Sequence, residues 1–121
     1  MNPKKWHKEI WFEDGVEEAI RNIFASFIKL SYTRHAMLQT IQDRYGIIPT
    51  CRVSDLKDAE IFEYTKENGY LKKIAIRVKN LSNELDYCYS ISVEGNVITA
   101  WANKKDDIHY TLDRKLYEGN K

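Results

Sequence analysis

The sequence predicts an α+β fold, with two N-terminal helices followed by a four-stranded antiparallel meander and both helices on one face of the sheet. Three observations predict it. Apolar residues recur every three or four positions over residues 16–45, and from residue 59 the apolar period changes to two. The third observation is Asn68-Gly69, a type I′ turn signal between two alternating stretches. A helical half followed by a strand half is typical of this class.

The first helix is expected over residues 16–30. Its apolar residues form a single stripe: Val16, Ala19, Ile20, Ile23, Phe24, Phe27 and Ile28. Asp14 stands at the N-cap position, and Glu17 follows at the spacing of a capping box.

The second helix is expected over about residues 33–44. Ser31 or Thr33 is its N-cap, and Gly46 provides a C-terminal stop. Its apolar stripe recurs every four residues, at Met37, Ile41 and Tyr45. Both helical stripes are expected to pack against the sheet.

The Asn68-Gly69 turn fixes the predicted register of the first hairpin, because it makes Glu67 the partner of Tyr70. On one face the expected pairs are Ile61 with Ile76 and Glu63 with Ile74. On the other face they are Glu60 with Arg77, Phe62 with Ala75, and Tyr64 with Lys73. The opposite charges of Glu60 and Arg77 favour this register.

The second hairpin is expected to turn at Glu94-Gly95 or at Gly95-Asn96. With either two-residue turn, Ile98 and Ala100 join the apolar face. The opposite face then carries Ser90, Ser92, Thr99, Trp101 and Asn103. A three-residue turn would reverse the two faces of the last strand.

The length of 121 residues suits one domain. Its expected parts are an N-terminal extension (1–13), a helical part (14–46), the sheet (59–104) and a tail on the sheet rim (105–121). The net charge of +1 argues against both a strongly basic nucleic-acid coat and an acidic DNA mimic. No stretch predicts a signal peptide or a membrane span. The two cysteines, Cys51 and Cys88, favour a reducing cytoplasmic location with free thiols, with a disulfide as the alternative.

The sheet face away from the helices is expected to carry aromatic, cationic and amide side chains together. They are Phe62, Tyr64, Lys73, Arg77, Trp101 and Asn103. Such a face suits RNA or single-stranded nucleic acid, because bases stack on rings while cations hold phosphates. The alternative is that Phe62 and Trp101 are half-buried packing residues and the lysines are solvated.

His35 is expected in the first turn of the second helix. A helix N-terminus disfavours imidazolium and favours anions, so a neutral His35 suits a general base, with Arg34 as an anion ligand. The alternative is a surface histidine bonded to the backbone.

His109 has Asp107 two residues before it and Thr111 two residues after it. In an extended segment the three share one face, so that the carboxylate fixes the imidazole tautomer and the hydroxyl binds a phosphate oxygen. In a turn, Asp106 or Asp107 would cap backbone amides instead. No zinc or calcium spacing and no Gly-rich phosphate loop occurs, so neither a metal nor another cofactor is expected.

Two segments resemble a known family. "YTRHAMLQTIQDRYGI" resembles the opening helix of small phage and toxin-associated domains, and "VITAWANKKDDIHYTLD" resembles the closing segment of phage-borne proteins. Both resemble the Barnase–EndoU–colicin–RelE fold group, over about residues 31–117. The resemblance implies helices followed by a four-stranded antiparallel sheet, and often a metal-independent RNase. It marks six positions: His35, Trp101, Asn103, Asp107, His109 and Thr111.

The leading hypothesis is therefore a metal-independent endoribonuclease-like domain acting on tRNA or mRNA. His35 and His109 would share acid and base work on the ribose 2′-hydroxyl and the leaving 5′-oxygen. Arg77, with Lys73 and Thr111, would stabilise the charge on phosphorus, while Tyr64 and Trp101 stack bases. The alternative is a non-catalytic phage-borne protein that binds and inhibits a host or defence protein. The oligomeric state is not predicted.

Overall fold

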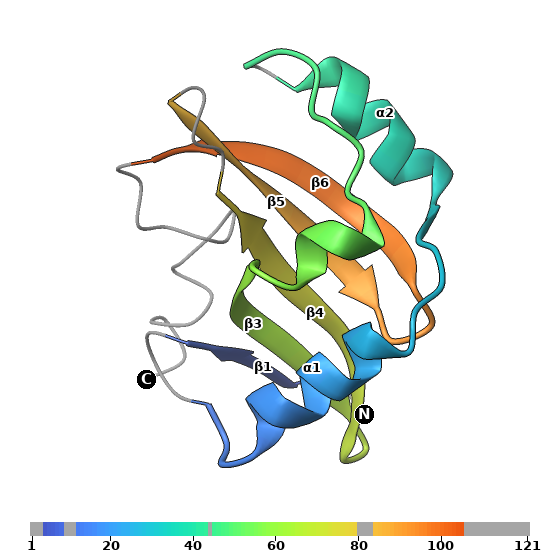
Figure 1. The fold of residues 1–121 in the computed structure, drawn as a ribbon, viewed down its shortest axis with the longest axis vertical. Coiled ribbons are helices and arrows are strands. Elements are labelled where there is room, and N and C mark those ends of the chain that lie inside the picture. Colours follow the sequence, from blue (N-terminus) through green and yellow to red (C-terminus); the bar gives the residue numbers. More distant parts are fainter. Residues whose placement is uncertain (1–3, 9–11, 44, 80–83, 106–121) are drawn as a thin grey trace.

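The computed structural model describes residues 4–8, 12–43, 45–79 and 84–105. The fold is α+β, as expected, but its single sheet has six strands in the order β1-β3-β4-β5-β6-β2 (Figure 1). β2 runs parallel to β6, and all other neighbouring strands are antiparallel. The predicted four-stranded meander is therefore the centre of a wider sheet, and strands precede and separate the two helices.

The elements follow one another along the chain with these bounds. They are β1 (Lys4–His7), α1 (Val16–Ala25), β2 (Ser31–Tyr32), α2 (Arg34–Gln42), the 3-10 helix η1 (Val53–Leu56), β3 (Glu60–Glu67), β4 (Tyr70–Val78), β5 (Leu85–Ser92) and β6 (Asn96–Lys104). Both α-helices end earlier than the sequence predicts, α1 at Ala25 and α2 at Gln42.

β1 lies within the segment that the sequence predicts to be an N-terminal extension. It pairs with β3, and the Trp6 ring stacks on Tyr64 with centroids 4.9 Å apart. The exposed Lys4 and Lys5 are typical of a short edge strand, where charge discourages pairing with another chain. Four residues are too few for alternation to be recognised, so no strand signal is visible in this part of the sequence.

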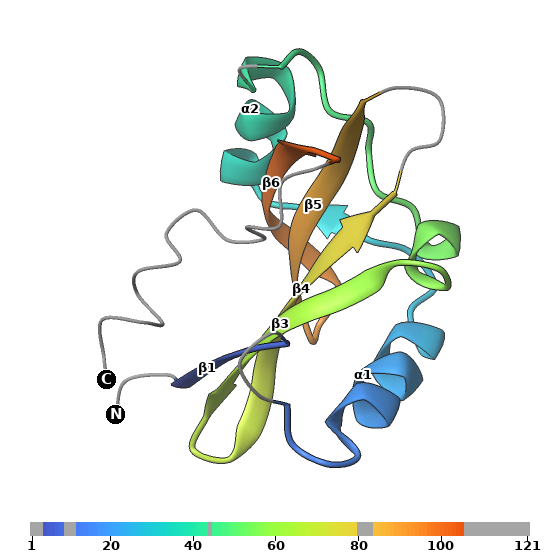
Figure 2. The ribbon, with the colours of Figure 1, turned by 90° about the vertical axis from the view of Figure 1, so that its left-hand side faces the viewer.

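α1 covers one face of the sheet together with η1 (Figure 2). Its buried residues are Val16, Ile20 and Phe24, each four positions from the next. The predicted Asp14 cap is wrong: Gly15 is the N-cap, with φ of 78°, and no side chain caps this end in the described part of the chain. Arg21 ties α1 to the η1 region, donating to the carbonyl oxygens of Leu56 (2.9 Å) and Ala59 (2.8 Å).

α2 lies along the outer edge of β6 (Figure 1), and its Ala36 is fully buried in the same core cluster as the buried residues of α1. Thr33 is its N-cap, as one of the two predicted candidates, and its Oγ1 accepts from the Ala36 N–H. Gln39 Oε1 accepts from the Ala100 N–H at 2.9 Å, and Asp43 Oδ1 from the Ala102 N–H at 3.4 Å. Side chains of α2 and its C-cap thus satisfy edge donors of β6 that would otherwise invite another strand.

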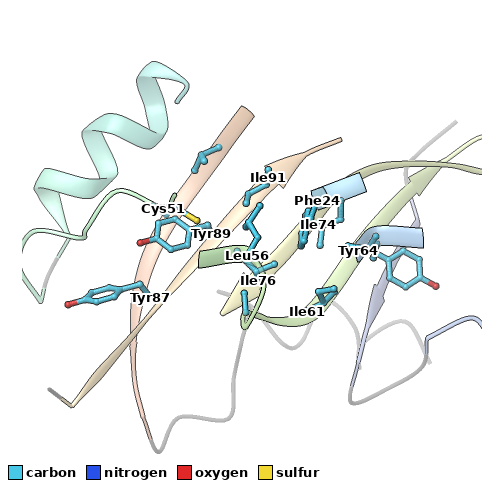
Figure 3. Close-up of a cluster of buried hydrophobic side chains, with 14 of the residues drawn as sticks. Phe24, Cys51, Leu56, Ile61, Tyr64, Ile74, Ile76, Tyr87, Tyr89 and Ile91 are labelled. Carbon is cyan, nitrogen blue, oxygen red and sulfur yellow. The ribbon is translucent and has the colours of Figure 1, made fainter. Parts of the chain in front are cut away.

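The main core lies between the sheet and α1, and Figure 3 shows its centre. Ile61, Ile74 and Ile76 are at most 1% exposed there. Two tyrosine hydroxyls fix the connection between α2 and η1 above this core. Tyr89 donates to the Pro49 carbonyl oxygen, and Tyr32 accepts from the Cys51 N–H.

In the first hairpin, residues pair as predicted at both ends of the two strands, but the pairs between these ends are shifted by one residue. Asn68 and Gly69 both have positive φ, as a type I′ turn requires, and Ile61 pairs with Ile76 as predicted. Between these points Phe62 is an extra residue on β3 and Lys72 an extra residue on β4. The predicted pairing of Tyr64 with Lys73 is therefore wrong. Tyr64 pairs with Ile74 and Thr65 with Lys73, because each bulge shifts the register by one residue.

The second hairpin contains two irregularities that cancel. Residues 93–95 connect β5 to β6, so the connection has the three-residue length that would reverse the faces of β6. Ile98 is then an extra residue, which restores the register from Thr99 onward. Trp101 therefore opposes Cys88 and Asn103 opposes Asp86, so both residues lie on the face that a two-residue turn predicted for them. Val97, and not Ile98, lies in the core.

Candidate functional site

The sheet face opposite α1, called the second face here, carries buried charged and polar side chains. Arg77 and Asp86 are each 3% exposed, Asn103 is 6% exposed, and His7 is 4% exposed. Charged side chains are almost never this buried unless they are paired. Burying polar and charged groups normally costs free energy. In the described sheet, such groups are concentrated on the second face.

An ion-pair network lies on the second face near the end of β6. Arg77 Nε donates to Asp86 Oδ2 at 2.9 Å, and a terminal guanidinium nitrogen donates to the Lys104 carbonyl oxygen at 2.8 Å. Lys105 Nζ binds the second carboxylate oxygen of Asp86 at 2.8 Å. Asp86 thus holds two cations beside the end of β6, and such charge-assisted bonds fix their orientation.

A small apolar cluster adjoins this network. It consists of Phe62, Ala75 and Cys88, with the half-buried Trp101 packed against it. The Trp101 and Phe62 rings meet edge to face, with centroids 6.2 Å apart. Trp101 therefore packs against Phe62 and keeps part of its surface exposed.

A second group of ionisable residues lies where β1 meets β3. His7 stands opposite Glu63, Lys5 opposite Thr65, and Thr65 opposite Lys73 on β4. Burial raises the pKa of the Glu63 carboxyl, and the charges of Lys5 and Lys73 oppose that shift. Within the described residues, Glu63 Oε2 and the Thr65 hydroxyl have no hydrogen-bond partner. A half-buried carboxyl with a raised pKa, beside a histidine, marks a candidate functional group.

The structure brings four of the sequence-predicted residues onto the second face: Lys73, Arg77, Trp101 and Asn103. It corrects a fifth. Tyr64 was expected to stack bases on this face, but it is fully buried in the main core, and its hydroxyl bonds Glu13. The Phe62 bulge is the physical reason, because the residues after it change faces.

Arg34 and His35 are exposed in the first turn of α2, as predicted, but they are not beside the Arg77–Asp86 pair. The backbone N–H of Thr33, just before them, donates to the Val97 carbonyl oxygen. Asn103 lies six residues further along β6, which is about 20 Å at roughly 3.3 Å per residue. The start of α2 and the ion-pair network therefore lie near opposite ends of β6.

Asp107, His109 and Thr111 lie outside the described residues, so their placement relative to this face stays a prediction. The described residue nearest to them in sequence is Lys105, which binds Asp86.

Three residues of the second face were missed by sequence reasoning. Asp86 interrupts the apolar stretch "LDYCYSIS" and opposes Asn103, so a carboxylate inside a central strand was an available signal. Glu63 gave a similar signal, because the predicted register put its carboxylate on the face of Ile61 and Ile76, whereas His7 showed none. Their pairing requires both the short β1 strand and the Phe62 bulge.

Both cysteines are free and buried, but in different clusters: Cys51 in the main core and Cys88 on the second face. Burial raises the pKa of the Cys51 thiol to about 12, which disfavours the reactive thiolate. Among the described residues, no group of three or more His, Cys, Asp or Glu side chains is arranged to hold a metal ion. No described helix is long and apolar enough to cross a membrane.

Comparison with protein-family models, with curated proteins and with solved structures found no match to this chain. The resemblance to the Barnase–EndoU–colicin–RelE group therefore remains a prediction from the two quoted segments.

Proposed function

We propose that the second face binds RNA and supports metal-independent endoribonuclease-like cleavage. The observation that carries this proposal is a grouping of side chains on one face. Cations, the half-buried Trp101 and the unpartnered Glu63 Oε2 lie there together. The whole chain has a net charge of only +1, so the cations on this face are a local feature. Phosphodiester cleavage of this type needs cations near the phosphate, a base, an acid and a surface for a base ring. The second face supplies cations, a candidate base and a ring surface.

Binding is assigned to the half-buried residues of the face. Lys73 contacts a backbone phosphate, and the accessible part of Trp101 stacks on a base. Arg77 is held by Asp86 and the Lys104 carbonyl oxygen, so it contributes fixed positive charge at the end of β6. Asp86 is then a positioning residue, since it orients Arg77 and Lys105.

In the chemical step, a base removes the proton of the ribose 2′-hydroxyl, and the resulting oxygen attacks phosphorus. An acid gives a proton to the leaving 5′-oxygen, while cations stabilise the charge that develops on the phosphate. The products are a 2′,3′-cyclic phosphate and a free 5′-hydroxyl.

The acid and base require a revision of the sequence hypothesis, which paired His35 with His109. His35 lies near the far end of β6 from Arg77, whereas Glu63 lies on the second face with a raised pKa and an unpartnered oxygen. We therefore assign the base to Glu63 and keep His109 as the acid, as the sequence predicts.

The test is incubation of the purified protein with tRNA and with mRNA in EDTA, followed by analysis of the product ends. We expect cleavage with cyclic phosphate ends, and a large loss of rate in Glu63→Gln and His109→Ala. Ile28→Ser is a matched control, because Ile28 is 95% exposed and lies outside the second face. RNA that stays intact with stoichiometric protein would contradict the enzyme assignment.

One observation favours the alternative of a non-catalytic protein that binds a host or defence protein. Arg77 and Asp86 are each 3% exposed and bonded to each other, so their network also suits a purely structural role. Expression in a bacterial host separates the two functions. Growth arrest that persists in both Glu63→Gln and His109→Ala, without RNA cleavage, would support the binding function.

A further inference from the structure

Three side chains form a row across β1, β3 and β4 on the second face. Lys5 stands directly opposite Thr65, and Thr65 stands directly opposite Lys73. Side chains at directly opposed positions have Cβ atoms about 4.5–5.5 Å apart and lie on the same side of the sheet. The Thr65 side chain is therefore flanked on both sides by a lysine. We call these three residues the Lys5–Thr65–Lys73 row.

Thr65 carries a polar group that packing does not explain. The residue is 2% exposed, and its hydroxyl oxygen has no hydrogen-bond partner within the described residues. A buried hydroxyl without a partner lowers stability, and a valine would fill nearly the same space without this loss. Because a hydroxyl can donate one hydrogen bond, an acceptor placed beside Thr65 would remove the penalty.

The two lysines can bind the same acceptor. In the described part of the chain, neither Lys5 nor Lys73 forms an ion pair. Burial raises the pKa of the Glu63 carboxyl and the charges of both lysines lower it, so both ammonium groups act on the side of the sheet where Glu63 and Thr65 lie. An ammonium group has three donors and no acceptor. The row therefore offers donors from two sides, and its complement is an anion.

Two carboxylates limit which anion can bind. Glu63 and Glu67 lie two residues before and two residues after Thr65 on β3, on the same face as Thr65. Their negative charges oppose those of Lys5 and Lys73, so the row has little net charge to attract a simple ion such as chloride. A tetrahedral oxyanion instead has several acceptor oxygens, which can bind donors on different sides at once. The row therefore favours a phosphate group over a halide.

We propose that the Lys5–Thr65–Lys73 row is a phosphate-binding site. The phosphate lies between the two ammonium groups, and one of its oxygens accepts from the Thr65 hydroxyl. Both lysine side chains can move apart to admit it, because no described ion pair holds them. Resting on the proposed function, this phosphate belongs to RNA and lies beside Glu63, which is two residues or roughly 7 Å along β3. The ribose attached to it is then within reach of the Glu63 carboxyl.

Sulfate is the probe for this site, because it has the shape of phosphate and keeps its charge where phosphate titrates. Amide chemical shifts of the isotope-labelled full chain are followed by NMR during a sulfate titration, with ionic strength held constant by sodium chloride. We expect saturable shifts at Lys5, Thr65 and Lys73. Thr65→Val and Lys5→Gln should each weaken sulfate binding about tenfold, as expected for the loss of one hydrogen bond to a charged group.

Lys4→Gln is the matched control for Lys5→Gln. It removes the same charge from the same strand, but Lys4 stands opposite Lys66 and lies on the other side of the sheet. This variant should bind sulfate like the wild type. Thr65→Val should keep or raise the thermal midpoint measured without sulfate, because it removes a buried hydroxyl that has no described partner. Weaker binding by this variant would then not result from a loss of folded protein.

A 2′-O-methyl oligonucleotide tests whether the phosphate belongs to RNA. It cannot be cleaved, because the attacking hydroxyl is blocked. Thr65→Val should weaken its binding, and sulfate should compete with it. Unchanged oligonucleotide affinity in Thr65→Val, together with weakened sulfate binding, would overturn the assignment to RNA and support a site for free phosphate.

Glu63→Gln separates this site from the proposed cleavage. The variant should lose cleavage but keep or tighten sulfate binding, because it removes a negative charge beside the row. RNA that stays intact while sulfate binds saturably at the row would contradict the enzyme function and support the site. Sulfate shifts that do not saturate would overturn the site. So would sulfate binding that Thr65→Val, Lys5→Gln and Lys4→Gln all change equally.

Discussion

The two faces of the sheet are built from the same strands but from different chemistry. On β4, Ile76 and Arg77 are adjacent, and both are almost completely buried. Ile76 points into the main core among aliphatic and aromatic side chains, whereas Arg77 lies on the second face and is bound by Asp86. The core face gains stability from burial of apolar area. The second face buries charges, which costs desolvation free energy and yields fixed orientation in return.

Burial by itself therefore does not distinguish a packing residue from a functional one. Both faces have residues below 5% exposure, but within the described residues a buried ion pair and unpartnered polar atoms occur together on the second face. Unpartnered polar atoms lower stability unless a ligand or partner satisfies them. Function is therefore expected on the second face, and the variants below test that division.

The largest effect is expected from Asp86→Ala. This change leaves the Arg77 guanidinium buried without its carboxylate, which typically costs about 3–5 kcal/mol in unfolding free energy. Urea denaturation measures the loss. The paired change Arg77→Met with Asp86→Leu should recover most of it, because no uncompensated charge remains. A loss below about 1 kcal/mol for Asp86→Ala would show that solvent already screens the pair.

Ile76→Ala is expected to cost about 2–5 kcal/mol, since it removes a side chain that is 0% exposed and leaves a cavity. Its effect should be confined to the core face. RNA affinity, measured per folded molecule, should equal that of the wild type. A weaker affinity of the folded fraction would show that the two faces are coupled through β4.

Trp101→Ala distinguishes base stacking on the half-buried Trp101 ring from packing of this ring against the protein. If a base stacks on Trp101, the change should weaken RNA binding by about 1–3 kcal/mol. Because Trp101 is only half-buried, the loss of stability should stay below the roughly 3–5 kcal/mol of a full aromatic core deletion. Affinity and thermal unfolding on the same variant provide the check. A loss of stability with unchanged affinity would make Trp101 a packing residue.

The smallest effect on the free energy of unfolding is expected from Glu63→Gln, and this effect depends on pH. The pKa of Glu63 is raised in the folded state, so the folded state binds more protons than the unfolded chain. Its contribution to stability is present below the unfolded pKa and is lost as pH rises through the folded pKa. At pH 7 the Gln variant should therefore be more stable than the wild type, by at most about 1–2 kcal/mol.

Thermal unfolding between pH 4 and pH 7 tests this sign. The advantage of Glu63→Gln should shrink toward acid pH, where the wild-type carboxyl is protonated. Glu67→Gln is a matched control on the same strand, and its stability relative to the wild type should not follow this trend. A Glu63→Gln variant that is less stable than the wild type at pH 7 would show that the carboxylate has a favourable partner.

Several features of the fold follow from local sequence. The Asn68-Gly69 turn, the Thr33 cap and the buried stripe of α1 each depend on residues close together in the chain. The face on which Trp101 and Asn103 lie was also predicted, although two compensating irregularities lie behind it. Local patterns were therefore sufficient to predict the α+β class and to place Lys73, Arg77, Trp101 and Asn103 on one face.

The positions of the bulges, the two edge strands and the orientation of α2 depend instead on tertiary contacts. A sheet repeats every two residues, so one extra residue such as Phe62 sends Tyr64 to the opposite face, and no local signal marks where that residue falls. β1 exists because β3 offers an edge and Trp6 can stack on Tyr64. α2 exposes its apolar stripe because its polar side chains bond the edge of β6. Each outcome depends on partners distant in sequence, and periodicity along one segment carries no information about them.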